Sequence, residues 1–230
     1  MKKSNMILTG ITTILLGTAL ITDAMLKDAY RKIDLDDPEK NSLTYPVQPF
    51  KALHITGGNS YLVQVVQAPR FALKVNRSRQ SFLDTSRAGD TLKIGFTVGS
   101  HPGNGVEDLP VGLTIFCPDI RYIYFSGTQN LVRQLTGDSV SIRQDGHTWT
   151  TLAGSTILSL DLQGSQESWY ELKDIRVTGQ FHLGLRENAG INLRDMACRA
   201  FYPVVGDHVR VVFSGKSIHT CTLFTSPTPP

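Results

Sequence analysis

The chain has 230 residues, of which 40% are hydrophobic and 19% are charged, and this balance excludes a disordered or collagen-like polymer. Its formal net charge of +3 is too small for the basic surface that non-specific nucleic-acid binding needs, so no nucleic-acid partner is expected. The three cysteines, Cys117, Cys198 and Cys221, contain no CxxC pair, which argues against a disulfide framework and a zinc site.

The first predicted element is a helix over an uncharged run of 19 residues from Ser4 to Thr22. A helix rises about 1.5 Å per residue, so this run can cross the roughly 30 Å hydrocarbon core of a bilayer, whereas a signal peptide needs only about 7 to 15 apolar residues. We therefore predict a transmembrane anchor over residues 1–26. A cleaved signal peptide is the alternative, because Thr22-Asp23-Ala24 loosely resembles a cleavage site. A buried helix of a cytosolic protein is disfavoured, because the run is apolar on all sides.

Basic residues flank both ends of this run, so charge alone does not fix its orientation. The short N-terminal arm favours a cytosolic N-terminus. We expect a single-pass protein of a bacterial membrane, with its body in the periplasm or outside the cell. Five residues before Met6 are too few to bind a cytosolic partner, which disfavours a transmembrane signalling protein.

Residues 27–49 mix charges of both signs with three prolines and are predicted to be a linker. The body is predicted over residues 50–225, and the Pro-rich residues 226–230 are predicted to be a frayed tail. Apolar and polar residues alternate through the body, most clearly in Thr91–Phe96 and Val111–Cys117, which is typical of β-strands. Further strands are expected at Ala52–Ile55, Tyr61–Gln67, Phe71–Val75, Ile120–Phe125, Val140–Ile142, Thr156–Leu162, Leu172–Val177, Val209–Phe213 and Ile218–Phe224.

Two series of glycines recur in the second half of the chain at spacings of 25 to 27 residues. They are Gly127, Gly154, Gly179 and Gly206, and Gly137, Gly164, Gly190 and Gly215. Most of these glycines end a short apolar run, and glycine adopts the positive φ of a tight bend without steric cost. The pattern predicts an all-β body of the parallel β-helix or β-solenoid type, with a β-sandwich or meander as the alternative.

Three segments of the body resemble the auto-transporter adhesin head GIN domain family of bacterial envelope proteins. Phe50–Gly58 is similar to the first strand of that family, Gly89–Ile94 to its hairpin, and Leu113–Gly127 to its strand, Pro, turn, strand and Ser-Gly pattern. The resemblance covers residues 50–225. It implies a right-handed parallel β-helix-like body behind an N-terminal membrane segment or signal, and it implies no established activity.

The residues that could carry chemistry form no recognised catalytic or metal-binding motif. His182, His208 and His219 lie in the repetitive half, but no HxH, HxxxH or HExxH occurs, so we predict neither metal nor cofactor. Some parallel β-helices cleave polysaccharides with carboxylates and a basic residue on one face. The candidates for such a site are Asp161, Asp174, Asp195, Arg176, Arg186 and Arg194. Each of these aspartates reads equally well as the solvent-facing half of a strand.

Aromatic residues provide a better indication of binding, because exposed Tyr and Trp side chains stack on sugars and anchor protein interfaces. The candidate ligand-contact residues are Tyr122, Tyr124, Trp149, Trp169 and Tyr170. Tyr122 and Tyr124 share a face opposite to Ile123 and Phe125. Either face of that strand could be the interior one, so a core position is the alternative. The cysteines are interpreted as small buried apolar residues, with one disulfide as the alternative.

Together these patterns predict a membrane-anchored cell-envelope protein with a β-solenoid binding or structural module of adhesin-like character. Its expected partners are the membrane and either a glycan or another envelope protein. The alternative is a polysaccharide lyase or hydrolase, which would gather acidic and basic side chains in one groove.

Overall fold

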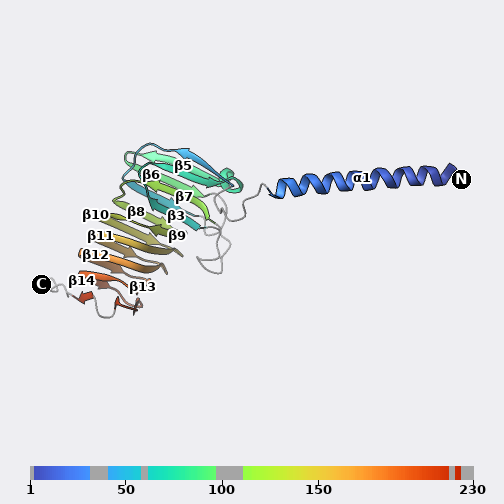
Figure 1. Ribbon diagram of the computed structural model, residues 1–230. Coiled ribbons are helices and arrows are strands. Elements are labelled where there is room, and N and C mark those ends of the chain that lie inside the picture. The colour runs from blue at the N-terminus through green and yellow to red at the C-terminus, as the bar shows by residue number, and fades with distance from the viewer. Residues whose placement is uncertain (1–2, 32–40, 58–61, 97–110, 218–220, 224–230) are drawn as a thin grey trace. The chain divides into compact units, whose positions relative to one another are not determined.

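The computed structural model describes residues 3–31, 41–57, 62–96, 111–217 and 221–223. The chain divides into two compact units, Met1–Lys40 and Asn41–Pro230 (Figure 1). The first contains the helix α1, Lys3–Arg31, and the second contains all of the strands.

Helix α1 has 29 residues, and its segment Thr9–Asp28 is apolar enough to cross a membrane. The segment has 20 residues, a mean hydropathy of 1.5 and no buried share, so it is not the core helix of a soluble domain. The hydroxyls of Thr13, Thr18 and Thr22 donate to backbone carbonyls of the preceding turn, which satisfies these polar groups within the helix. A signal sequence meets the same criteria of length and composition.

The strands of the second unit follow one another along the chain with one 3₁₀ helix, η1, among them. Their bounds are β1 Ser42–Pro46, β2 Ala52–Thr56, β3 Leu62–Gln67, β4 Ala72–Asn76, η1 Arg77–Phe82, β5 Leu83–Ala88, β6 Thr91–Phe96, β7 Val111–Cys117, β8 Tyr122–Ser126, β9 Gln129–Arg133, β10 Thr136–Asp145, β11 Trp149–Gly164, β12 Trp169–Leu185, β13 Gly190–Arg194, β14 Ala197–Val205, β15 Arg210–Ser214 and β16 Cys221–Leu223.

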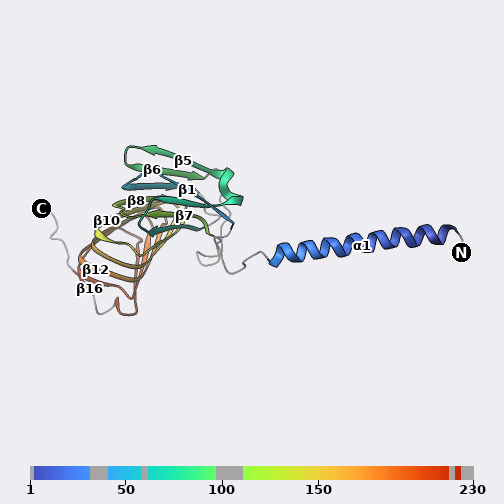
Figure 2. The same ribbon diagram turned by 45° about the horizontal axis from the view of Figure 1, so that its top comes forward.

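These strands stack in parallel as two faces of a β-solenoid (Figures 1 and 2). Face one consists of β6, β2, β8, β10, residues 156–164 of β11, residues 175–185 of β12, β14 and β16. Face two consists of β7, β3, β9, residues 149–153 of β11, residues 169–173 of β12, β13 and β15. Strands β1, β4 and β5 pair antiparallel at the margins. The solenoid predicted from the sequence is confirmed.

The coil repeats every 19 to 21 residues, which corrects the predicted period of 25 to 27. Positions 122, 141, 161, 182 and 202 lie side by side on face one, in steps of 19, 20, 21 and 20 residues. The step of 21 contains a bulge, at which β12 inserts an extra residue near Gly179 opposite Leu158. The glycine series therefore mixed bends with a bulge and did not trace equivalent positions of successive coils.

The corner that leads from face two back to face one has one residue with positive φ in each regular coil. These residues are Gln134, Gly154, Asp174, Asp195 and Gly215, with φ between 52° and 62°. The opposite corner, from face one to face two, uses Gly57, Gly127 and Gly146 in the first coils and non-glycine residues such as Glu167, Asn188 and His208 in later ones. Because Asp, Asn and Gln also adopt this conformation here, glycine spacing alone could not reveal the period.

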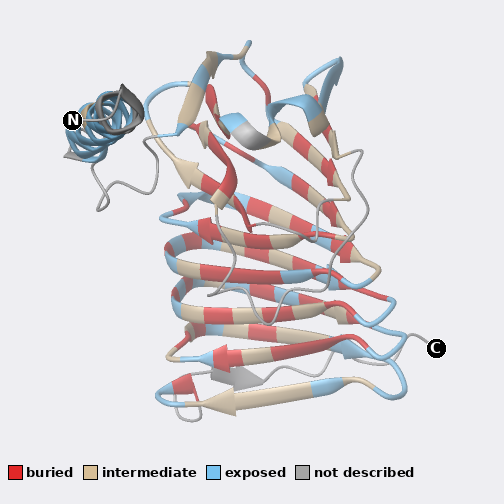
Figure 3. Ribbon diagram, turned by 90° about the vertical axis from the view of Figure 1, so that its right-hand side faces the viewer, coloured by how far each residue is buried: buried red, intermediate tan, exposed pale blue. Residues whose placement is uncertain are grey.

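Alternate side chains of both faces point into the coil and form one hydrophobic core, visible as repeated red segments in Figure 3. Leu113, Ile115 and Cys117 of β7 are fully buried, as the alternation predicts. Burial raises the pKa of the Cys117 thiol to about 12, with a smaller contribution from the negative charge of Asp119. Cys117 and Cys198 are free, buried thiols. The side chain of Cys221 lies outside the described residues.

Part of the interior beside the corner from face one to face two is polar. Asn130 is fully buried, and its amide nitrogen donates to the hydroxyls of Thr128 and Thr150 at 2.9 and 3.1 Å. Thr148 and Ser168 are buried in register with Thr128. Polar side chains at inward positions interrupt the apolar alternation, which is why the sequence did not predict β9.

Two domain boundaries differ from the prediction. Strand β1 lies inside the predicted linker 27–49 and pairs with β4, and Tyr45 packs against the core, so the compact unit begins at Asn41. The helix continues to Arg31, beyond the predicted end of the anchor at residue 26. The predicted tail 226–230 lies outside the described residues.

Candidate functional site

The outward side chains of face one form two parallel columns that run across the coils. One column consists of Tyr122, Ser141, Asp161, His182 and Tyr202, and the other of Lys93, His54, Tyr124, Arg143 and Gln163. We call these ten residues the tyrosine face. Their inward neighbours Ile123, Phe125 and Ile142 are fully buried, so Tyr122 and Tyr124 point away from the core, as one of the two alternatives predicted. Tyr122 is 39% exposed.

Ring contacts and hydrogen bonds hold these outward side chains in place. The rings of His182 and Tyr202 stack with centroids 4.9 Å apart and planes 12° apart, and His54 meets Tyr124 edge to face at 4.4 Å. The Tyr124 hydroxyl donates to Asp145 Oδ2 at 2.6 Å, and the Ser141 hydroxyl donates to Asp161 Oδ2 at 3.0 Å. Side chains fixed in this way lose little conformational freedom when a ligand binds.

The pKa values of two groups on the tyrosine face follow from these surroundings. Partial burial lowers the pKa of the His54 imidazole, the positive charge of Lys93 lowers it further, and Asp145 acts in the opposite direction. Burial and the hydrogen bond to Asp145 raise the pKa of the Tyr124 hydroxyl. Both groups are therefore uncharged at neutral pH, and the aromatic part of the surface binds as neutral rings.

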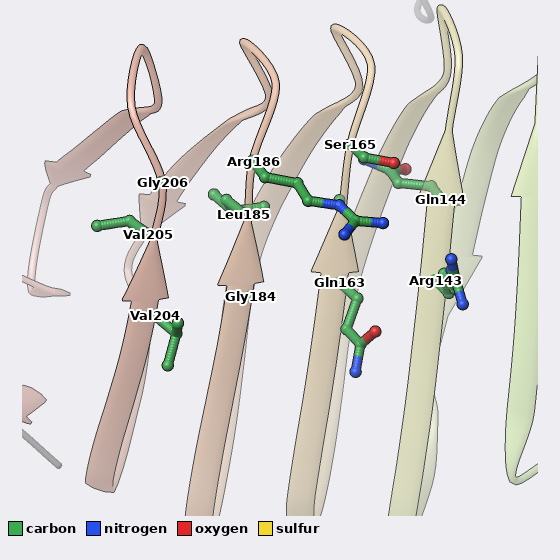
Figure 4. Close-up of a pocket in the computed structure, with 11 residues that line it drawn as sticks. Arg143, Gln144, Gln163, Ser165, Gly184, Leu185, Arg186, Val204, Val205 and Gly206 are labelled. Carbon is green, nitrogen blue, oxygen red and sulfur yellow. The ribbon is translucent and has the colours of Figure 1, made fainter. Parts of the chain in front are cut away.

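A groove of about 610 Å³ lies where face one ends at the corner to face two (Figure 4). Four successive coils line it, with Arg143 and Gln163 on one side and Val204 and Val205 on the other. Figure 4 shows the Arg186 side chain extending from its own coil across the neighbouring coil, which carries Gln163 and Ser165. The groove is continuous with the tyrosine face, because Arg143 and Gln163 belong to both.

Tyr170 is a core residue, and the prediction that it contacts a ligand is wrong. It is 1% exposed, and its hydroxyl donates to the carbonyl oxygens of Ile142 and Gln163 at 2.9 and 2.8 Å. Leu172, two residues later, is also buried, so the alternation places both side chains inside the coil. Burial raises the pKa of the Tyr170 hydroxyl well above its usual value.

Trp149 and Trp169 lie on face two, so the structure does not bring them together with Tyr122 and Tyr124. The two indoles occupy neighbouring coils with ring centroids 5.8 Å apart, and Trp149 is 40% exposed. The Trp169 ring occupies the space next to Gly190, where an added Cβ would lie 2.2 Å from the ring. The pair thus packs along its own face, and the absence of a side chain at Gly190 makes that packing possible.

The residues considered for polysaccharide cleavage do not form one cluster. Asp174 and Asp195 are left-handed corner residues between face two and face one, whereas Asp161 lies in the middle of face one. Arg186 is at the opposite corner and lies 3.9 Å from Glu187, and Arg194 lies 3.8 Å from Asp195. Arg176 is an exposed residue of face one. This arrangement does not favour a lyase or hydrolase.

The histidines are also dispersed. His182 stacks on Tyr202, His208 is an exposed corner residue, and His219 lies outside the described residues. Among the residues that the structure describes, no three His, Cys, Asp or Glu side chains are placed to share a metal ion.

Sequence reasoning missed His54, Tyr202, Arg143 and the groove. Tyr122 and Tyr202 are 80 residues apart and share a column only because four coils of about 20 residues separate them. The spacing of the left-handed corner residues would have revealed this period if non-glycine residues had been counted.

No protein-family model matches the chain, and no curated protein matches it. Among solved structures, a "putative adhesin" from Bacteroides fragilis is 16% identical, with a TM-score of 0.47, covering 82% of this chain and 99% of that one. A "putative adhesin" from Parabacteroides merdae is 11% identical, with a TM-score of 0.44, covering 81% and 95%. A "putative lipid binding protein" from Parabacteroides distasonis is 10% identical, with a TM-score of 0.37, covering 82% and 98%. The fold assignment rests on the strand pairing of this chain.

Proposed function

We propose that the chain is a membrane-anchored cell-envelope protein whose β-solenoid binds a glycan through the tyrosine face, as an adhesin-like module. The observation that carries this proposal is the outward column of aromatic and polar side chains on a flat, parallel face. Tyrosine rings stack on the apolar faces of sugars, and neighbouring Ser, Asp and Gln side chains bond to sugar hydroxyls.

The geometry of the solenoid suits an extended ligand. Neighbouring strands are about 4.8 Å apart, so each coil presents an equivalent position at a regular interval along the stack. Tyr122 and Tyr202 lie four coils apart in the same column, with Ser141, Asp161 and His182 between them. A polymer that crosses the coils would contact many side chains, each weakly, whereas a small compact ligand would contact few.

The location outside the cytosol is also part of the proposal. It is supported by the apolar segment Thr9–Asp28 and is consistent with the resemblance of residues 50–225 to the GIN domain family. Membership of that family is itself proposed. Reporter enzymes fused after Pro230, one active only outside the cytosol and one only inside it, test the location. Activity of the exported reporter is expected, and activity of the cytosolic reporter alone would overturn it.

Binding is tested with the full chain in detergent micelles, by its retardation in native gels that contain a soluble polysaccharide. We expect retardation by at least one plant or bacterial polysaccharide, and we expect Tyr122→Ala with Tyr202→Ala to abolish most of it. The matched control is Tyr122→Phe with Tyr202→Phe, which keeps both rings and should retain binding if stacking is the main contribution. Equal retardation of the alanine and phenylalanine variants would contradict a role for these rings.

A further inference from the structure

We propose that the groove at the end of face one, lined by Arg143, Gln163, Arg186 and Val204, binds the anionic group of an acidic glycan that lies on the tyrosine face. This inference rests on the proposed function and adds the class of glycan to it. The anionic group is a carboxylate or a sulfate on a sugar, because both are planar or tetrahedral oxyanions that guanidinium groups bind.

The groove exists because one position in the outward column has no side chain. Arg143, Gln163, Gly184 and Val204 are in register on successive coils, so Gly184 leaves a gap between Gln163 and Val204. A Cβ added at Gly184 would lie 3.8 Å from Gln163 Cγ, which is an ordinary contact, and its φ is not positive. Neither packing nor backbone conformation requires glycine at this position, which leaves the open groove as its consequence.

The donors that remain available in the groove are side chains. The backbone N–H groups of Ser165, Arg186 and Gly206 already donate to carbonyl oxygens of the preceding coil at 2.8 to 3.2 Å. Arg143 is exposed and forms no ion pair within the described part of the chain, and the Nε of Arg186 lies 3.9 Å from the exposed Glu187. Two guanidinium groups that face one groove, with a single loosely placed carboxylate beside them, favour an anionic ligand.

The opposite wall gives the ligand an apolar surface. Val204 is 67% exposed and Val205 is 50% exposed, although both follow a buried strand of the core. A sugar ring has an apolar face and polar edges, so it fits between these valines and the arginines, whereas an inorganic anion would use only the arginines. Because Arg143 and Gln163 belong to both surfaces, one polymer can occupy the groove and the tyrosine face together.

The test compares three soluble polysaccharides with the full chain in detergent micelles: polygalacturonate, which carries carboxylates, dextran sulfate, which carries sulfates, and neutral hydroxyethylcellulose. The variants are Arg143→Gln with Arg186→Gln, and Gly184→Val, which fills the groove without changing any charge. The matched control is Arg133→Gln with Arg210→Gln, which removes two exposed arginines from face two.

We expect one acidic polymer to bind more tightly than the neutral one. The groove arginine variant and Gly184→Val should each weaken that binding about tenfold or more, with the face-two control close to wild type. The preferred acidic polymer identifies carboxylate or sulfate as the anion. An equal loss in the face-two control would overturn the groove by showing general charge attraction. Tight binding of hydroxyethylcellulose alone would overturn the inference and leave the proposed function standing, whereas no binding to any polysaccharide would overturn both.

Discussion

Face one and face two are built by the same coils, and their inward side chains form a single core, but their outward side chains differ. On face two, Lys173 pairs with Glu171 at 3.2 Å, the hydroxyl of Ser214 donates to Asn192, and Trp169 covers Gly190. These contacts use the polar and aromatic groups within the face itself. On face one the rings of Tyr122, Tyr124 and Tyr202 stand outward beside the groove. The difference shows that the coil provides stability on both faces and presents binding groups mainly on one.

The largest expected effect separates inward from outward positions. Phe125→Ala on face one and Leu172→Ala on face two each remove a fully buried side chain, and each should lower the free energy of unfolding by about 2 to 5 kcal/mol. Tyr122→Ala should change it by about 0.5 kcal/mol or less, because this side chain is exposed. Urea denaturation of the full chain in detergent micelles measures all three. A cost at Tyr122 equal to that at Phe125 would show that the tyrosine face is structural.

A pair of glycines sharpens the contrast between the faces. Gly190→Ala on face two would place a Cβ 2.2 Å from the Trp169 ring and should cost about 1 to 3 kcal/mol of stability. Gly184→Ala on face one meets only Gln163 at 3.8 Å and should cost much less. The quantity to compare is the denaturation midpoint, together with tryptophan fluorescence, which should change only in the Gly190 variant. An unchanged midpoint for Gly190→Ala would mean that Trp169 can leave its place at no cost.

The corners that join the faces allow a backbone test without any packing change. Gly154 has a φ of 58°, and nothing lies within 4 Å of an added Cβ, so Gly154→Ala should cost about 1 kcal/mol through backbone conformation alone. Gly137→Ala is the matched control, since that glycine is equally open and lacks a positive φ. Thermal denaturation of both variants is the measurement. Equal melting temperatures would contradict the left-handed corner at residue 154.

The smallest expected effect is a pH dependence on face one. Burial and Lys93 lower the pKa of His54 in the folded state, so the unfolded chain takes up its proton at a higher pH than the folded chain. The contribution of His54 to stability is therefore complete above its unfolded pKa of about 6.5 and decreases as the pH falls below that value. His54→Gln should remove this part of the pH dependence. Identical stability profiles of the variant and the wild type between pH 5 and 7.5 would contradict it.

Strand positions could largely be predicted from the sequence, because most inward residues are apolar and alternate with outward ones. Thr91–Phe96 and Val111–Cys117 match β6 and β7 to the residue. Strand β9 was missed because the inward Asn130 is polar. The inward direction of Tyr170 was available from its alternation with Leu172.

The candidate site was harder to predict because it depends on the coil period. In β11 and β12 the chain turns from face two to face one without a break in the strand, and Gly154 and Asp174 mark those turns with different residue types. Without the 20-residue period, nothing in the sequence relates His54 to Tyr124 or Arg143 to Gly184. The groove is also a missing side chain, and a gap in three dimensions has no local sequence signal.

Hydroxyl-radical footprinting of the full chain with and without polygalacturonate tests the central proposal most directly, because it reports which side chains a bound polymer covers. The proposal predicts reduced oxidation of Tyr122, Tyr124, His182 and Tyr202 on face one, with Trp149 and Trp169 on face two unchanged. Reduced oxidation of the two tryptophans with no change at the tyrosines would contradict it and assign the binding surface to face two.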